Sequence, residues 1–426
     1  MSNYRDYFKG KKITVMGLGL LGRGVGDVKF LAECGADLIV TDLKTKVQLA
    51  DSIKNLAKFK NVKFVLGEHR LQDFRNRDLI IKAAGVPLGS PYILEAEKNK
   101  IPVEMSTALF VKLSGIKTIG VTGTRGKSTV TQLIYEILKA AGKTVYLGGN
   151  VRGLSTLALL KKVKPSDWMA LELDSWQLQG FGALRISPHI AVFTNLLPDH
   201  LNYYQNNMDR YFADKANIYK YQKSGDHLVA GPNVAPRLGY QSVKALPNNW
   251  KLKLFGEHNR ENAAFAKKVG EILKIKPEII KKVITSFSGV AGRLELVRTW
   301  RGIKIYNDTT STTPAALAAA LRALGSAKKN MVLIMGGADK NLNFAEIFPL
   351  TKEFCKKVIL LPGTGTDKLS LEGKKVTTLK EAVALAKEEA GRGDIILFSP
   401  GFASFGLFKN EFDRGDQFNK LVRNLK

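Results

Sequence analysis

The sequence predicts an α/β protein of three domains. Its 426 residues exceed one ordinary domain, and a composition of 45% hydrophobic and 24% charged residues is typical of globular proteins. Apolar strand patterns alternate with amphipathic helix patterns along the chain, which predicts parallel sheets covered by helices. Changes in this pattern place the expected domains at 1–105, 106–290 and 291–426.

The first domain opens with a strand–helix–strand pattern. Strands are expected over 12–16, 37–41 and 78–81. Between the first two lies Gly17-x-Gly19-x-x-Gly22, and Asp42 closes the second strand. Small residues at such a turn let a phosphate approach a helix N-terminus, and the acid can bind a ribose hydroxyl. Taken alone, the turn favours NAD, with a tight turn that binds nothing as the alternative.

A second glycine-rich loop lies in the central domain, between a strand over 116–122 and a helix over 128–141. Backbone N–H groups of such a loop cradle phosphates, the lysine balances their charge, and the hydroxyl reaches Mg²⁺. The strict phosphate-loop pattern fails by spacing, because it would require glycine at Val121. A shortened form remains, made of Gly123, Thr124, Arg125, Gly126, Lys127, Ser128 and Thr129.

Two further residues of the central domain are candidate metal ligands. Glu172 lies in an apolar strand expected over 168–173, and a buried carboxylate is costly unless it is paired or binds a cation. A neighbouring lysine is the alternative partner. His200 follows the strand over 190–194, although a lone histidine is more often a loop or core residue. A helix over 259–273 is expected near the end of this domain.

The third domain repeats the alternation of strands and helices. A helix pattern covers 379–390, and a parallel sheet is again predicted. The expected strands cover 302–306, 331–335, 358–361 and 394–398.

Bulk properties narrow the class of partner. The net charge of +28 alone indicates a polyanion, but no arginine-rich arm or zinc finger accompanies it, and the lysines are scattered. A lysine-rich solvated surface without a nucleic-acid partner is expected. The two cysteines, the absence of an apolar run of about 20 residues and a polar N-terminus predict a cytoplasmic protein without membrane contact. A monomer is expected.

A series of short segments is distributed along the whole chain, at 17–22, 123–129, 148–150, 171–178, 194–201, 214–219, 256–262, 292–295, 307–314, 336–340 and 399–405. Each segment is weak when taken singly, but their order and spacing resemble the Mur ligase family. Phe408-Lys-Asn and Arg414-Gly-Asp favour the D-glutamate-adding branch of that family.

The resemblance implies a Rossmann-like N-terminal domain, a P-loop central ATPase domain and a Rossmann-like C-terminal domain. It replaces NAD with the UDP of a sugar substrate, whose implied contacts are Gly19, Leu20, Leu21, Asp42, Gly85 and Asn150. ATP is implied to contact segment 123–129 with Asn259, Asn262, Arg293 and Asp308. Two Mg²⁺ sites are implied at Ser128, Glu172, His200 and a carbamylated Lys215, and the implied catalytic residues are Lys127, His200 and Lys215.

The implied reaction joins D-glutamate to UDP-N-acetylmuramoyl-L-alanine through an acyl phosphate, in peptidoglycan synthesis. D-Glutamate is expected at Thr312, Lys340, Ser404 and Phe405. One departure is Thr310, where many relatives carry lysine. A different amino-acid substrate is the main alternative, and a basic P-loop ATPase that acts on nucleic acid is a more distant one.

Overall fold

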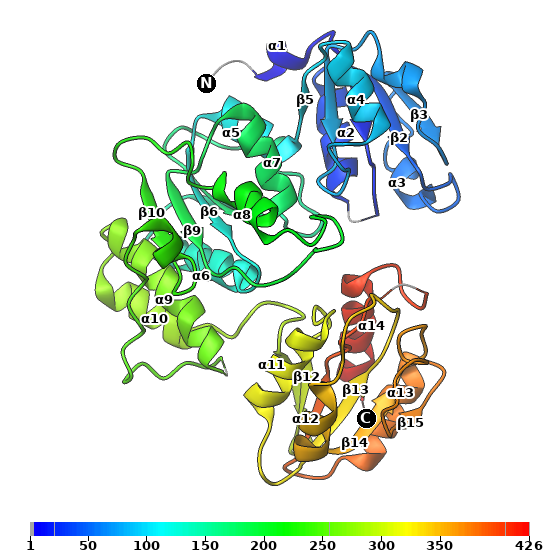
Figure 1. The fold of residues 1–426 in the computed structure, drawn as a ribbon, viewed down its shortest axis with the longest axis vertical. Coiled ribbons are helices and arrows are strands. Elements are labelled where there is room, and N and C mark those ends of the chain that lie inside the picture. The colour runs from blue at the N-terminus through cyan, green and yellow to red at the C-terminus, as the bar shows by residue number, and fades with distance from the viewer. Residues whose placement is uncertain (1–3, 21, 255, 405, 426) are drawn as a thin grey trace. The chain divides into compact units, whose positions relative to one another are not determined.

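The computed structural model describes residues 4–20, 22–254, 256–404 and 406–425. The chain forms three open α/β sheets (Figure 1), as the alternating pattern predicted. It divides into two compact units, Met1–Trp250 with Glu261–Ile284, and Lys251–Arg260 with Thr285–Lys426. The first two sheets belong to the first unit and the third sheet to the second unit.

The first sheet is parallel, with the strand order β3-β2-β1-β4-β5. The order reverses between β1 and β4, and open parallel sheets bind ligands outside the carboxyl ends of the strands at such a point. Its elements are α1 (Tyr4–Phe8), β1 (Lys12–Met16), α2 (Arg23–Glu33), β2 (Asp37–Asp42), α3 (Ala50–Lys54), β3 (Val62–Leu66), η1 (Leu71–Phe74), β4 (Leu79–Lys82), α4 (Pro91–Lys98) and β5 (Val103–Glu104).

The second sheet is also parallel, with the order β10-β9-β6-β8-β7 and the predicted strands in place. Its strands are β6 (Lys117–Thr122), β7 (Val145–Gly149), β8 (Trp168–Glu172), β9 (Ile190–Phe193) and β10 (His227–Ala230). The accompanying helices are α5 (Ser106–Ser114), α6 (Lys127–Ala140), η2 (Leu157–Lys161), α7 (Ser175–Leu184), α8 (Met208–Ala216), η3 (Ala235–Leu238), α9 (Glu257–Ile272) and α10 (Pro277–Ser286).

The third sheet corrects one prediction, because it is mixed and not wholly parallel. Its order is β11-β12-β16-β13-β14-β15, and β11 pairs antiparallel with β12. Arg301 and Gly302, which join these strands, have φ of 48° and 83°. Two such residues in succession make a hairpin turn whose twist matches that of the strands. Strand β11, which was not predicted, is therefore a local hairpin partner of β12 at the sheet edge.

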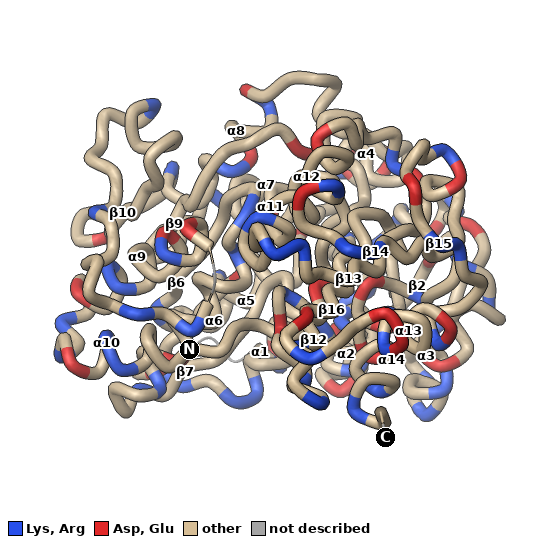
Figure 2. The backbone as a smooth tube through the Cα atoms, turned by 90° about the horizontal axis from the view of Figure 1, so that it is seen from below, with Lys and Arg blue, Asp and Glu red and all other residues tan. Residues whose placement is uncertain are grey.

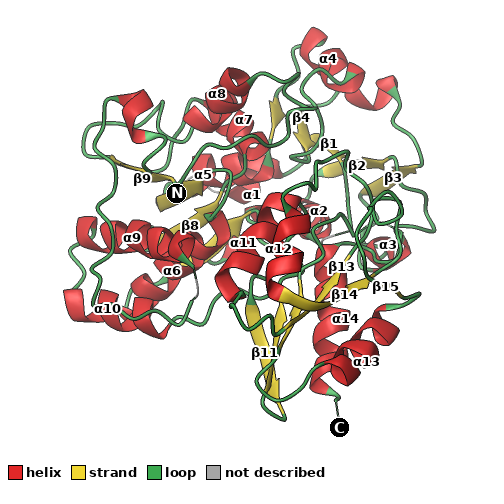
Figure 3. Cartoon of the chain, turned by 60° about the horizontal axis from the view of Figure 1, so that its bottom comes forward, coloured by secondary structure: helices red, strands yellow, loops and turns green. Residues whose placement is uncertain are grey.

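Helices α11 to α14 accompany this sheet (Figure 3). The remaining elements of the second unit are β11 (Glu295–Trp300), β12 (Ile303–Asn307), α11 (Pro314–Leu324), β13 (Met331–Met335), α12 (Ile347–Phe354), β14 (Cys355–Leu360), β15 (Lys374–Lys375), α13 (Leu379–Glu389), β16 (Ile395–Phe398) and α14 (Glu411–Arg423).

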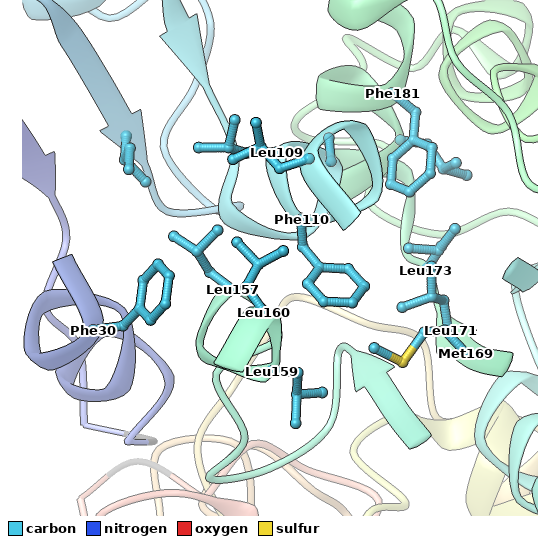
Figure 4. Packing of buried hydrophobic residues seen from close by; sticks show 14 of the residues in the cluster. Phe30, Leu109, Phe110, Leu157, Leu159, Leu160, Met169, Leu171, Leu173 and Phe181 are labelled. Atoms are coloured by element: carbon cyan, nitrogen blue, oxygen red, sulfur yellow. The ribbon is translucent and has the colours of Figure 1, made fainter. Parts of the chain in front are cut away.

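One hydrophobic core joins the first two sheets. Phe30 of α2 lies in the same buried cluster as Phe110 of α5 and Leu157 and Leu160 of η2 (Figure 4). Ser155 Oγ donates a hydrogen bond of 2.6 Å to Asp27 Oδ1 beside this cluster. Apolar packing and a buried polar contact therefore fix α2 against the central sheet domain.

The charged side chains follow no single stripe. Figure 2 shows lysine and arginine positions spread along the tube and mixed with acidic ones. Within the part of the chain that the structure describes, no helix is long and apolar enough to cross a membrane.

Asp27 makes the docking of α2 sensitive to pH. Burial raises the pKa of Asp27 from 3.8 to about 6. The folded state therefore binds the Asp27 proton more tightly than the unfolded state does. The contribution of protonated Asp27 to the free energy of unfolding is complete below about pH 3.8 and is lost as pH rises through about 6. Asp27→Asn should gain thermal stability relative to the wild type as pH rises from 4.5 to 7.5.

Melting curves across that pH range measure the effect. Asp209→Asn is the matched control, because its side chain is 91% exposed. A Tm difference between wild type and Asp27→Asn that does not change with pH would contradict the role assigned to this carboxyl.

Candidate active site

The loop between β6 and α6 has the geometry of a phosphate-binding loop. Gly126, the residue before α6, has φ of 85°, and a Cβ added there would lie 2.2 Å from Asn262 Oδ1. Gly123 has φ of 143°, and its added Cβ would meet Thr194 Oγ1 at 1.9 Å. Only glycine fits either position, which explains why the shortened motif keeps both of them.

A second loop, after β9, holds the first one in place. Asn195 accepts a hydrogen bond from the Thr124 backbone N–H at 2.9 Å and, through Oδ1, from the Arg125 N–H at 2.9 Å. Thr194 Oγ1 donates to the Arg125 carbonyl at 2.6 Å. Thr124 Oγ1 accepts from the Leu197 N–H at 2.9 Å and donates to the Leu197 carbonyl at 3.1 Å. These contacts fix the loop before any ligand binds.

Two lysines converge on this loop. Lys127 Nζ donates to the Gly123 and Thr124 carbonyls at 3.0 and 3.1 Å. Lys215 Nζ, from α8, donates to the Gly123 carbonyl at 3.0 Å, and the residue is 1% exposed. Burial, and then the charge of Lys127, hold the pKa of Lys215 well below its usual value. Lys215 is therefore a buried amine that gives up its proton more readily than an ordinary lysine.

His200 lies beside Trp176 of α7, with ring centroids 4.6 Å apart. Asp199 bridges this region to the phosphate loop, with its Oδ2 at 3.9 Å from His200 Nε2 and 3.8 Å from Arg125 Nη1. Burial lowers the pKa of His200 below its usual value, so the imidazole is mostly neutral at pH 7. A neutral imidazole can bind a metal ion.

Glu172 ends β8 next to β6 and is only 6% exposed. Among the described residues its carboxylate has no hydrogen-bond or ion-pair partner, and the lysine alternative is not realised. Its backbone carbonyl accepts from the Asn150 N–H at 2.7 Å. No group of three His, Cys, Asp or Glu side chains in the described ranges could hold a metal by itself. A cation at Glu172 would therefore need oxygen ligands from a bound phosphate or from a modified side chain.

The glycine-rich turn of the first sheet is organised by Asp42. Its Oδ2 accepts from the Gly19 N–H at 2.9 Å, and its Oδ1 accepts from the Lys44 N–H at 2.9 Å. Gly85 follows β4 and is exposed, Leu20 is 41% exposed, and Leu21 lies outside the described residues. The buried carboxylate therefore shapes the turn from within.

In the second unit, Asp308 follows β12 and is buried. Its Oδ2 accepts from Ser399 Oγ at 2.8 Å and its Oδ1 from the Leu294 N–H at 3.1 Å. Burial raises the pKa of Asp308 to about 7. Arg414, which is fully buried, donates to the carbonyls of Thr309 and Phe402 at 2.7 and 3.1 Å. Sequence analysis had given Arg414 no role, because its contacts are with distant backbone groups.

The residues expected to bind an amino acid lie on neighbouring loops of this unit. Lys340 Nζ is 3.3 Å from Thr312 Oγ1, and Ala338 pairs with Ala403, which brings the loop of Ser404 beside that of Lys340. Phe405 lies outside the described residues. The Thr310 hydroxyl makes a different contact, because its Oγ1 donates to the Gly292 carbonyl at 2.9 Å.

The predicted nucleotide contacts are divided between the two units. Ser128, Thr129 and Asn262 belong to the first unit with the phosphate loop, and Asn259, Arg293 and Asp308 belong to the second. Asn259 and Asn262 lie on the same helix, α9, which crosses the boundary between the units.

Sequence comparisons identify the family. Three family profiles match: the Mur ligase MurD-like N-terminal domain over 11–104, the Mur ligase middle domain over 121–233, and the Mur ligase glutamate ligase domain over 292–402. A relative from Roseiflexus sp. (strain RS-1), named UDP-N-acetylmuramoylalanine–D-glutamate ligase, is 34% identical over 98% of this chain and 99% of its own. This chain belongs to the Mur ligase family.

Other Mur ligases agree with this assignment. A protein of the same name from Borreliella afzelii (strain PKo) is 35% identical over 98% of both chains. The structure of UDP-N-acetylmuramate–alanine ligase MurC from Thermotoga maritima matches 98% of this chain with a TM-score of 0.64 and 18% identity. MurF from the same organism, solved in complex with ADP, gives a TM-score of 0.59 at 16% identity over 99% of this chain. These structures share the three-domain Mur ligase fold.

Lys127 is expected to carry the phosphate-binding charge of this Mur ligase. Lys127→Ala should weaken ATP binding and reduce phosphate release by a factor of about 100 to 1,000, because a positioned cation stabilises the charge that develops on transfer. Phosphate release and calorimetric ATP binding measure both effects. Lys139→Ala, at the exposed end of the same helix, is the control. Equal rates for the two variants would refute the role.

Proposed function

We propose that this protein is the ATP-dependent ligase that adds D-glutamate to UDP-N-acetylmuramoyl-L-alanine in peptidoglycan synthesis. The observation that carries the proposal is identity of 34–35% to ligases of that name over 98% or more of both chains. The phosphate loop with its two converging lysines supports it. We further propose that the protein acts as a monomer in the cytoplasm.

The reaction takes place in two steps. A carboxylate oxygen of the L-alanyl group attacks the γ-phosphorus of ATP, and the bond to ADP breaks, which leaves an acyl phosphate. The amine of D-glutamate then attacks the acyl carbon, and a tetrahedral intermediate expels phosphate and loses the amine proton. Such transfers depend on positioning and charge neutralisation more than on covalent catalysis. In this chain Lys127 and the backbone N–H groups of the loop supply both.

Mg²⁺ fits the chemistry of the donors proposed for it. Glu172, at the end of β8, has a carboxylate without a partner among the described residues. Ser128 on α6 has a hydroxyl, and His200 after β9 has a mostly neutral imidazole. Mg²⁺ prefers oxygen ligands and is usually held by one or two carboxylates together with substrate phosphates. When bound, the ions would neutralise charge on the phosphates during transfer.

The domain roles follow from this assignment. Residues 1–105 would hold the UDP-sugar, with Gly19, Leu20, Leu21, Asp42, Gly85 and Asn150 as contacts. Residues 106–290 would hold the ATP phosphates at 123–129 and Asn262. Residues 291–426 would bind D-glutamate. Asn259, Arg293 and Asp308 are the further residues proposed to contact ATP.

Turnover should require both UDP-N-acetylmuramoyl-L-alanine and D-glutamate. Phosphate release from purified protein with ATP and Mg²⁺ should be close to background when either is omitted, because the acyl phosphate cannot form without the UDP-sugar and is not consumed without D-glutamate. The ligation product is identified by mass. The alternative within the family is a different amino acid, and faster turnover with L-lysine or diaminopimelate than with D-glutamate would favour it. ATP hydrolysis that is equally fast without either substrate would exclude the proposed function.

Lys215 is proposed to act as a carbamate. In its deprotonated form the amine attacks the carbon of CO₂ and loses a proton, which gives an anion able to bind Mg²⁺. An ammonium ion buried against Lys127 would repel the metal. The Lys215 side chain is buried at the phosphate loop and forms no salt bridge with a described carboxylate, which supports the carbamate.

Lys215→Ala should be inactive, and short carboxylic acids should restore part of the activity by replacing the carbamate. Phosphate release with and without added acetate or formate measures this rescue. Lys220→Ala, five positions along the chain and exposed, should keep wild-type activity without them. Full activity of Lys215→Ala in the absence of any acid would disprove the carbamate.

D-Glutamate is proposed to bind through Lys340, Thr312 and Ser404, with Phe405 beside them. Lys340 can offer a charged donor, whereas the Thr310 hydroxyl is committed to Gly292. Lys340→Ala should raise KM for D-glutamate about 10- to 100-fold, the equivalent of one charge-assisted hydrogen bond. Thr310→Ala should raise KM for D-glutamate by less than about threefold, since the proposal gives its hydroxyl no contact with the substrate. Steady-state kinetics at saturating ATP compare the two, and a larger effect for Thr310→Ala would reverse the assignment.

A further inference from the structure

The N-terminus of α2 meets the loop after β7 along a continuous seam. A Cβ added to Gly22 would lie 3.5 Å from Gly153 Cα, and one added to Gly26 would lie 2.5 Å from Ser155 Cβ. Between these close approaches, Arg23 Nη1 donates a hydrogen bond of 2.7 Å to Asn150 Oδ1. Arg23 directly follows the glycine-rich turn of the first sheet, and Asn150 directly follows the second-sheet strand β7.

The contact determines which way the Asn150 amide faces. A guanidinium has only donors, whereas an amide has one acceptor oxygen and one donor nitrogen. With Oδ1 held by Arg23, the Nδ2 group must point away from the arginine, and among the described residues it has no partner. The Asn150 backbone is fixed as well, because its N–H donates to the Glu172 carbonyl at 2.7 Å. Asn150 therefore presents a preset donor.

We propose that Arg23 is a positioning residue that orients Asn150 so that its Nδ2 donates to an oxygen of the sugar nucleotide. The inference rests on the proposed function, in which Asn150 contacts that substrate. An oriented donor suits a ligand rich in hydroxyl, amide and phosphate oxygens. Without Arg23 the amide can rotate and present its oxygen, which repels those same atoms.

A double-mutant cycle separates this role from the alternatives. Arg23→Met and Asn150→Ala should each raise both the Kd and the KM for UDP-N-acetylmuramoyl-L-alanine about tenfold, with KM for ATP unchanged. Because one residue acts through the other, the double variant should be no worse than Asn150→Ala. Arg23→Lys should recover part of the affinity, since lysine is also only a donor.

Lys161→Met is the matched control. Lys161 forms an ion pair with Glu33 at the other end of α2, so it also joins α2 to the central sheet domain but lies away from Asn150. This variant should bind the sugar nucleotide like the wild type. A tenfold loss here too, or a lowered Tm that explains the loss in Arg23→Met, would reduce Arg23 to a structural contact.

Calorimetric binding of the sugar nucleotide to the wild type distinguishes the possible failures. If the wild type binds it and the two single effects multiply in the double variant to about a hundredfold, Arg23 contacts the ligand directly and the positioning role is wrong. Unchanged affinity in Arg23→Met would also overturn the inference while leaving the proposed function intact. Absence of binding to the wild type would remove the proposed function and this inference together.

Discussion

The hydrogen bonds between the loop after β6 and the loop after β9 are the constraint on which the proposed chemistry depends. Two strands that are neighbours in the sheet end together, so the loops that follow them can bind one another. Asn195 and Thr194 use side chain and backbone to hold Thr124 and Arg125. The N–H groups that are not used in this way remain available for phosphate. The loop is therefore arranged before ATP arrives, and little of the binding energy is spent on ordering it.

Burial of ionisable groups follows from this arrangement. Lys215 can approach the Gly123 carbonyl only by lying under the loop, where it loses solvent and its pKa falls. In the second unit, Asp308 after β12 and Arg414 in α14 are also buried. Each of these buried ionisable groups lowers the free energy of unfolding relative to an apolar residue at the same position. Such costs are common at functional sites. The cost is offset by the large cores beneath the sheets.

The first unit holds together the two sites that are proposed to serve a single reaction. The turn expected to bind the sugar nucleotide lies on one sheet and the phosphate loop on another, joined by α2 and the cluster around Phe30. Ser155 and Asn150 meet α2 from the central sheet domain, so the same seam that stabilises the unit also passes beside Glu172. Stability and substrate alignment thus depend on the same contacts.

Local sequence predicted the central strands, the phosphate loop and the glycine-rich turn, because each of these signals lies within a few residues. It did not predict strands such as β11, whose place depends on pairing with β12. Local sequence also did not choose between NAD and UDP for the turn, since both carry a diphosphate. The proposal of UDP rests on resemblance along the whole chain.

Tertiary structure decided the contacts between residues far apart in sequence. Arg23 and Asn150 are separated by 127 positions, and nothing near either one indicates the other. Arg414 reaches Thr309 and Phe402, whose backbone carbonyls have no sequence signature. The residues around Lys215 gave it no role of their own, and only a family resemblance implied one; the structure adds its burial against the Gly123 carbonyl. In each case the deciding quantity is a distance or a loss of solvent, and folding alone sets both.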